Sequence, residues 1–189
     1  MSEEVGAVDV RNDMEELVRD EVRAVRDRAA GSRACWCPLC ETDVVALALT
    51  LLPPLYTRLD GSNAWSTSLA TTSKIHDAVQ AAAKRVTLRP KHPPGRSAER
   101  RGEVGLVNYT FEVGLQVIGS AMSASATPCA CARCRDDTLA YALNRYPAKY
   151  GVSTGGRRSL HPTYLDFMRH ELGMLVTQAA RLIGARPRH

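Results

Sequence analysis

A cysteine triplet with the spacing C-x-C-x₂-C occurs twice in this chain of 189 residues, at Cys35–Cys40 and at Cys129–Cys134. The 22-residue segments that begin with the triplets, Cys35–Tyr56 and Cys129–Tyr150, carry the same residue at nine positions. Two unrelated segments of this length would share about one or two residues, so the self-similarity indicates an internal duplication. A duplicated chain is expected to fold as two copies of one unit, which restricts its architecture more than any other feature does.

The similarity extends beyond the triplets in both directions. Upstream, the motif N-x₃-E at Asn12 matches the same motif at Asn108, an offset of 96 residues. Downstream, Ile75–Pro90 matches Leu172–Pro187 at an offset of 97 residues. We therefore expect four parts: a disordered tail (residues 1–9), a first module (10–87), a basic and proline-rich linker (88–103) and a second module (104–187).

Hydrophobic periodicity predicts about three helices in each module. The first helices are expected over residues 10–29 and 104–123. Short second helices are expected to begin near Asp43 and Asp137 and to end before Pro53 and Pro147, because proline cannot continue a helical hydrogen-bond ladder. The last helices are expected to follow residue 63 and to begin at Pro162. No segment alternates clearly between apolar and polar residues, so the predicted fold is all-α, with two homologous modules packed as a pseudo-two-fold dimer.

The composition restricts the compartment and the class of protein. No apolar run approaches the ~20 residues that a membrane-spanning helix needs, so no membrane association is expected. The N-terminal segment carries Glu3, Glu4 and Asp9, which is the wrong charge for a secretory leader. We therefore expect a cytoplasmic protein whose cysteines stay reduced. The sequence lacks the P-loop, dinucleotide-binding and serine-hydrolase motifs, which favours a protein that is not an enzyme.

Reduced cysteines in two tight clusters favour metal binding, and soft thiolates favour zinc. The predicted ligands are Cys35, Cys37, Cys40, Cys129, Cys131 and Cys134. Zinc prefers four ligands, so each triplet lacks one. Histidines do not help, since neither His92 nor His161 has an evident counterpart in the other copy. We expect a structural zinc site whose fourth ligand is water or a repeated carboxylate, from the pair Asp43 and Asp137 or the pair Glu16 and Glu112.

Three other interpretations of the triplets remain open at this point. The cysteines can be ordinary small buried side chains. They can hold an iron–sulfur cluster, although such clusters usually take four cysteines. They can also be reactive thiols of a redox sensor, which would require that no metal occupies them.

The order of motifs resembles that of the late competence development protein ComFB family. In the first copy, the N-x₃-E motif and the cysteine triplet are followed by D-x₂-A-x-A-L at Asp43 and by L-P-P-x-Y ending at Tyr56. The second copy is similar to the family over D-x₃-Y-A-L-N-R-x-P-x₂-Y, from Asp137 to Tyr150. The resemblance implies an all-helical, usually homodimeric protein, with zinc on the cysteines of some members. Other members are receptors for cyclic di-GMP and related cyclic nucleotides. Because members are typically single modules, this tandem chain resembles a covalent dimer.

If the chain binds such a nucleotide, as the resemblance implies, arginine or lysine would contact the phosphates, and acidic, arginine or aromatic side chains would contact the guanines. The candidate contacts are Asp43, Tyr56, Arg135, Asp137, Asn144, Arg145, Lys149 and Tyr150. The aspartates can instead cap helices, and the tyrosines can instead anchor packing. Thr50 and Leu51 replace the Asn-Arg pair in the first copy, so the two modules need not bind alike.

We expect a regulatory receptor for a cyclic dinucleotide or cyclic nucleotide that acts on an unknown protein partner. The alternative is a zinc-stabilised module that binds proteins or nucleic acid. Residues 1–90 carry a net charge of −2 and residues 91–189 a net charge of +7, so the basic part would supply a nucleic-acid surface. We rank this alternative second because no aromatic residues are interleaved with the charges of the linker.

Overall fold

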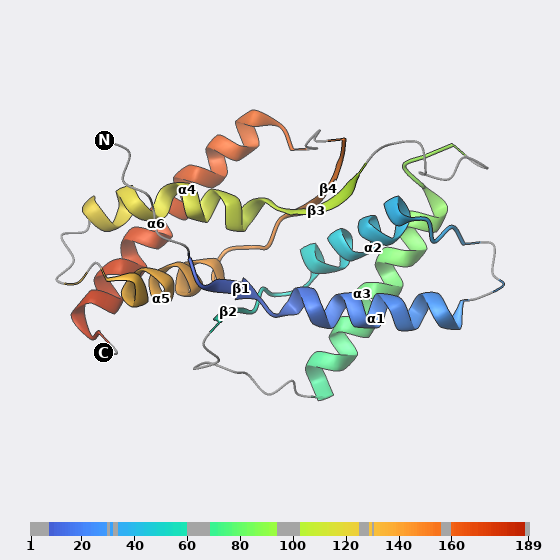
Figure 1. Ribbon diagram of the computed structural model, residues 1–189, viewed down its shortest axis with the longest axis horizontal. Helices are drawn as coiled ribbons and strands as arrows, with labels where there is room; N and C mark the ends of the chain where they lie inside the picture. The colour runs from blue at the N-terminus through green and yellow to red at the C-terminus, as the bar shows by residue number, and fades with distance from the viewer. Residues whose placement is uncertain are drawn as a thin grey trace.

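The computed structural model describes residues 8–29, 31, 34–59, 69–93, 103–124, 129, 131–155 and 160–187. The first module contains β1 (Val10–Asn12), α1 (Met14–Arg28), α2 (Pro38–Leu51), β2 (Tyr56–Arg58) and α3 (Leu69–Leu88). The second repeats this order with β3 (Val104–Asn108), α4 (Tyr109–Ala124), α5 (Ala132–Leu143), β4 (Tyr150–Thr154) and α6 (Pro162–Ala185). The internal duplication and the helical fold are thus confirmed (Figure 1).

Short strands are the main departure from the predicted secondary structure. Each of the expected first helices begins with a strand, β1 or β3, before α1 and α4 start. β1 pairs antiparallel with β2, and β3 pairs antiparallel with β4. The registers are equivalent, since Asn12 lies opposite Tyr56 and Asn108 lies opposite Tyr150. These strands are too short to show an alternating pattern, and each pairs with a segment more than 40 residues away, so local periodicity did not reveal them.

Local sequence explains where the cysteine-bearing helices begin. α2 starts at Pro38, several residues before the expected start near Asp43, with Cys37 in extended conformation at its N-cap. α5 starts at Ala132 with Cys131 at the equivalent N-cap position. Proline is favoured at the first helical position because its missing N–H would have no partner there. The last cysteine of each triplet, Cys40 or Cys134, therefore lies in the first turn of its helix, the middle cysteine is the N-cap residue, and the first cysteine precedes the helix.

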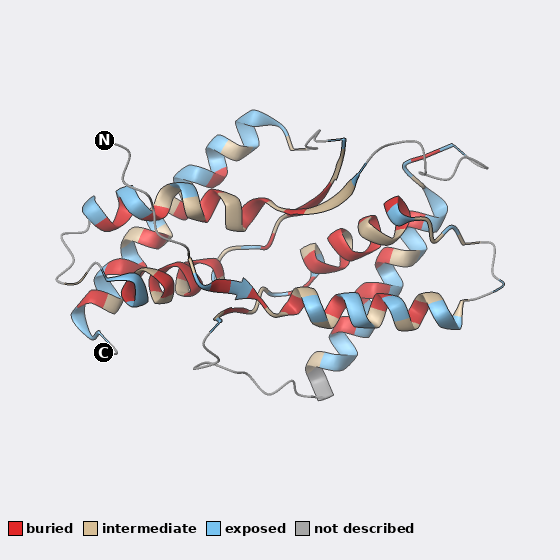
Figure 2. Cartoon of the chain, in the orientation of Figure 1, coloured by how far each residue is buried: buried red, intermediate tan, exposed pale blue. Residues whose placement is uncertain are grey.

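The strand pair of each module packs on the helices of the other module, an arrangement that we call the strand exchange. The core around α1, α2 and α3 includes Tyr150 and Val152 of β4, and the core around α4, α5 and α6 includes Val10 of β1 and Tyr56 of β2. In Figure 1 the two groups of helices lie at opposite ends with the strand pairs between them, and in Figure 2 the buried residues of the strands continue those of the helices. The pseudo-two-fold packing is therefore confirmed, and each core needs residues of both modules.

The tail and the linker are only partly described. Residues 1–7 of the expected tail and 94–102 of the expected linker lie outside the described residues. Val8 packs against the second core, and the backbone N–H of Leu59 donates to Asp9 O (2.9 Å). None of the described helices combines the length and the apolar character that crossing a membrane requires.

Candidate metal centres

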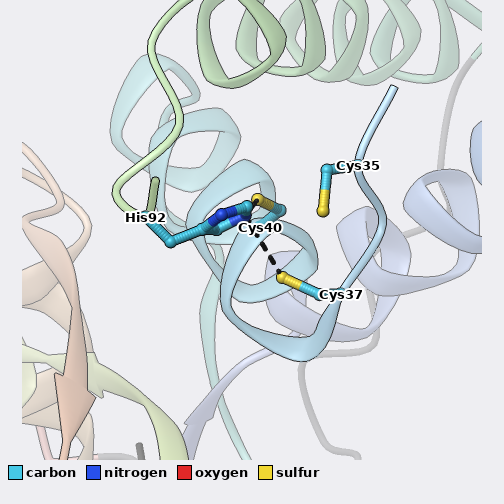
Figure 3. Close-up of side chains that lie close together, drawn as sticks. All are labelled: Cys35, Cys37, Cys40 and His92. Atoms are coloured by element: carbon cyan, nitrogen blue, oxygen red, sulfur yellow. Dashed lines mark hydrogen bonds between the residues drawn. The ribbon is translucent and has the colours of Figure 1, made fainter. Parts of the chain in front are cut away.

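Four side chains converge at the start of α2, three from the first module and one from the segment that follows α3. They are Cys35, Cys37, Cys40 and His92, whose ligand atoms all lie within 4.8 Å of one another. The Nε2 atom of His92 lies 3.1 Å from Cys40 Sγ and 3.6 Å from Cys37 Sγ. Figure 3 shows the imidazole, from the segment after α3, directed at the cysteines of α2. We call this group the first centre.

The first centre fits a tetrahedral zinc ion of the Cys₃His type. With Zn–S bonds of about 2.3 Å and Zn–N bonds of about 2.0 Å, the sulfur and nitrogen ligands of a tetrahedron lie about 3.5 Å apart, which is close to the 3.6 Å from His92 Nε2 to Cys37 Sγ and above the 3.1 Å to Cys40 Sγ. The Nδ1 atom of His92 lies 3.0 Å from Pro93 O. A carbonyl oxygen only accepts, so Nδ1 carries the proton and Nε2 presents its lone pair to the metal position. Such an outer hydrogen bond is typical of metal-bound histidines.

The prediction of a carboxylate or water as fourth ligand is wrong for the first centre. Asp43 is buried and accepts a hydrogen bond from Lys91 Nζ at 2.6 Å. This ion pair holds the residue that precedes His92 against α2, so Asp43 positions the histidine segment and is not a ligand. Glu16 is exposed on α1, outside the cysteine group.

The second module brings three cysteines together in the same way. The Sγ atoms of Cys129, Cys131 and Cys134 lie within 4.8 Å of one another, and we call them the second centre. Cys131 accepts a weak hydrogen bond from the backbone N–H of Cys134 (3.5 Å). Among the described residues, the second centre offers three metal ligands. Asp137, which was expected as a possible fourth ligand, lies instead beside the Arg58 guanidinium at 3.7 Å.

The thiols of the second centre differ in acidity. Burial and hydrogen bonds with Cys129 and Cys131 raise the pKa of Cys134 to about 12. The backbone N–H of Cys134 lowers the pKa of Cys131, because it stabilises the thiolate. Burial also raises the pKa of Cys40 in the first centre. A metal ion must therefore displace protons from the buried thiols, and its own charge then stabilises the thiolates. All six cysteines are described, and none forms a disulfide.

Sequence comparison agrees with this arrangement. The family model described as late competence development protein ComFB matches residues 11–90 and, separately, residues 107–187. The chain belongs to the ComFB family. No curated protein and no solved structure gives a significant match. Each ComFB match contains one cysteine triplet and one complete set of three helices, so the protein is a tandem ComFB chain.

The two repeated tyrosines meet at the centre of the tandem. Tyr150 Oη accepts hydrogen bonds from Asn12 Nδ2 and Asn108 Nδ2, both at 2.7 Å, and donates to Glu15 Oε1 at 2.7 Å. Tyr56 Oη donates to Asn108 Oδ1 at 3.1 Å. Tyr56 and Tyr150 are buried at 2% and 7% exposure. These predicted ligand contacts therefore join the modules, and the asparagines of the repeated N-x₃-E motif, which were not predicted as site residues, complete the network.

Asn144 also joins the modules. Its amide accepts from Tyr56 N at 2.7 Å and donates to Tyr56 O at 2.8 Å. The equivalent residue of the first copy, Thr50, accepts from Tyr150 N at 3.3 Å. The difference between the copies at this position therefore changes the number of hydrogen bonds between the modules.

The other predicted ligand contacts are spread over separate surfaces. Arg135 lies 3.3 Å from Asp136, Arg145 stacks on the Tyr141 ring at 3.4 Å, and Lys149 lies 5.4 Å from the Tyr164 ring centroid. The eight candidates thus do not form one pocket, because Arg135 and Arg145 lie near opposite ends of α5, while Tyr56 and Tyr150 are buried between the modules.

A cleft of about 470 Å³ opens beside the central network, between the modules. Asn108 and Phe111 line it from the second module, and the first module supplies both acidic and basic side chains: Arg11, Asp13, Glu15, Glu16 and Arg19. The Phe111 ring stacks on Tyr56 with a centroid distance of 6.1 Å and an interplanar angle of 11°. The cleft therefore combines an aromatic face with carboxylates and guanidiniums.

Proposed function

We propose that this tandem ComFB protein is a non-catalytic regulatory receptor, stabilised by zinc, that binds a cyclic dinucleotide such as cyclic di-GMP in the cleft between its modules. The observation that carries the proposal is the composition of the cleft, which both modules line. Its volume lies within the range of ~300–1,000 Å³ that is usual for small-molecule sites.

The side chains of the cleft match the parts of a guanine dinucleotide. The Watson–Crick edge of guanine presents N–H donors, which suit the carboxylates of Glu15 and Glu16. Arg11 and Arg19 can bind phosphate oxygens through charge-assisted hydrogen bonds. The Phe111 ring offers a base an apolar face. Each recognition element of the ligand thus has a counterpart within one cleft.

Because the cleft and the central network share residues, ligand binding can change how the two modules pack and so affect a contact with a partner protein. Glu15 and Tyr56 line the cleft and also belong to the central network between the modules. A ligand that binds one arrangement of this network more tightly shifts the population toward that arrangement. The orientation of the two helical groups, and with it a surface for a regulatory protein, would then depend on the ligand.

Calorimetry with cyclic di-GMP and cyclic AMP tests the proposal. Wild type should bind cyclic di-GMP, and Arg19→Ala should weaken binding at least tenfold, the scale of one lost charge-assisted contact. Arg23→Ala is the matched control, since Arg23 lies one turn further along α1 and pairs with Asp20 at 2.8 Å. The absence of heat from both nucleotides would reject the receptor. A salt-sensitive gel shift of duplex DNA in that case would support the nucleic-acid alternative.

A further inference from the structure

Both ends of α5 contact β2 of the other module. Near the start of the helix, the Asp137 carboxylate lies 3.7 Å from Nη1 of Arg58, the last residue of β2. At the end of the helix, the Asn144 amide accepts from Tyr56 N at 2.7 Å and donates to Tyr56 O at 2.8 Å. A helix of the second module therefore fixes a strand of the first module at two points.

The contact at the start of α5 is ionic and largely shielded from water. The side chains of Arg58 and Asp137 are 12% and 10% exposed. The preceding carboxylate, Asp136, is also buried and accepts from the backbone N–H of Asp9 at 3.4 Å. Both contacts reach the same end of the strand pair, because Val10 lies opposite Arg58. Since little water screens charges in such positions, a shift in the first turns of α5 would move this end of β1 and β2.

The second centre lies at the same end of α5. Cys131 is the N-cap residue and Cys134 belongs to the first turn. Asp137 follows Cys134 by three residues, so the two side chains are neighbours on the surface of the helix. A metal ion on the three sulfurs ties Cys129, which precedes the helix, to its first turn and thereby orders the start of α5. The metal position and the ion pair with Arg58 thus act on the same part of the helix.

The first centre has no ionic link of this kind. At an offset of 94, Arg58 corresponds to Val152 and Asp137 corresponds to Asp43. Val152 is an apolar residue of the first core, so it cannot form an ion pair with α2. Asp43 pairs with Lys91 instead. The two centres therefore differ in how they are connected to the strands of the opposite module.

The strand pair that α5 holds also lines the cleft between the modules. The cleft residues include Val10–Asp13, from β1 and the residue after it, and Tyr56 from β2. The Thr57 hydroxyl of β2 donates to Asp13 Oδ2 at 2.7 Å, and the strands are joined by their own ladder. The position of the strand pair therefore sets where Arg11 and Asp13 stand in the cleft.

We propose that a metal ion in the second centre holds β1 and β2 in the arrangement that forms the cleft, with Arg58 and Asp137 as positioning residues between the two sites. Its consequence for the nucleotide rests on the proposed function, because the affinity of the cleft then depends on the metal. The coupling is reciprocal: the metal tightens nucleotide binding by the same factor by which the nucleotide tightens metal binding. A soft divalent ion such as zinc thereby regulates the receptor through one of its two centres.

Hydrogen exchange of the full zinc-loaded chain tests this link without a nucleotide. Cys131→Ser removes a thiolate ligand but keeps a side chain that caps helices well. It should speed amide exchange of residues 55–59 at least fivefold, the lower end of usual coupling between sites. Cys37→Ser is the matched control, since Cys37 is the N-cap residue of α2 in the first centre, and it should leave this segment unchanged. Metal analysis of each variant gives the occupancy.

A double variant tests the two positioning residues. Arg58→Met combined with Asp137→Leu removes both charges, so that no buried charge is left without its partner. In the wild-type background, Cys131→Ser should weaken cyclic di-GMP binding at least fivefold. In the background of the double variant, which should keep two metal ions, Cys131→Ser should change neither the nucleotide affinity nor the exchange of residues 55–59.

The outcomes separate the metal link from the proposed function. Equal exchange of residues 55–59 in the two serine variants would overturn the link, as would an effect of Cys131→Ser that persists in the double variant, or a second centre without metal in wild type. If the exchange differs as expected but wild type binds no cyclic di-GMP, the proposed function fails and the metal link stands. Where circular dichroism shows that a serine variant has lost its fold, removing the metal with a chelator from wild type and from the double variant gives the same comparison.

Discussion

Replacing Tyr150 by phenylalanine should destabilise the protein much more than the same change at Tyr56, although the two residues are equivalent in the repeat. The Tyr150 hydroxyl accepts from Asn12 and Asn108 and donates to Glu15, each at 2.7 Å. Burial raises the pKa of Tyr150 well above its usual value, so the phenol keeps its proton and remains a donor. The Tyr56 hydroxyl exchanges hydrogen bonds with the neutral amide of Asn108, at 2.9 and 3.1 Å.

The magnitudes follow from these contacts. Tyr150→Phe removes a hydrogen bond to a carboxylate and leaves the buried Asn12 amide without an acceptor, which together cost about 3 kcal/mol. Tyr56→Phe removes a neutral interaction while Asn108 keeps other partners, so the cost is about 1 kcal/mol. For a chain of this size, the larger loss lowers the melting temperature by roughly 6–12 °C.

Equilibrium urea unfolding of the zinc-loaded variants measures the difference. Because each core contains residues of both modules, we expect one cooperative transition with the same denaturant dependence in wild type and in both variants. A loss for Tyr56→Phe that equals or exceeds the loss for Tyr150→Phe would refute the role that we assign to the central network. Two separate transitions would refute the claim that the strand exchange makes the cores interdependent.

Three further results are expected. Asn144→Ala should destabilise the protein by about 2 kcal/mol in urea unfolding, because two hydrogen bonds to the Tyr56 backbone are lost; an unchanged midpoint would contradict this. Lys91→Ala should lower the zinc affinity of the first centre about tenfold by chelator competition, because the pair with Asp43 positions the histidine ligand; a uniform effect on both centres would contradict it. Since burial raises the pKa of Cys134, a metal ion must displace the thiol proton, so zinc affinity should rise with pH and zinc should be released on acidification, measured with a zinc-sensitive dye.

The strand exchange accounts for why a tandem chain suits this fold. Tyr150 and Val152 complete the first core, while Val10 and Tyr56 complete the second. A single module would leave these apolar positions without a cover and would need a second copy to fold. A covalent tandem supplies that copy within one chain, and it also allows the copies to diverge, as they have at Phe111, which corresponds to Glu15 in the cleft.

The sequence by itself determined what depends on neighbouring residues and on repetition. Helical periodicity predicted the helices, and Pro162 marked the start of α6. The duplicated cysteine triplets identified the clusters that could hold a metal ion, and the order of motifs around them identified the family. Helical structure and the C-x-C-x₂-C spacing both arise within a few residues, so the chain records them directly. The sequence also contained a counterpart of His92, because an alignment of the two copies extended two residues beyond Pro90 would have matched His92 with His189.

Only the tertiary structure decided which distant residues meet. The strands are three to five residues long, and a segment so short becomes a strand only when its partner lies beside it. His92 lies 52 residues after Cys40, and two of the carboxylates that were expected as possible zinc ligands, Asp43 and Asp137, form ion pairs instead. Each of these outcomes depends on how the two modules and their helices pack, because burial and hydrogen bonding between distant segments override the preferences that neighbouring residues express.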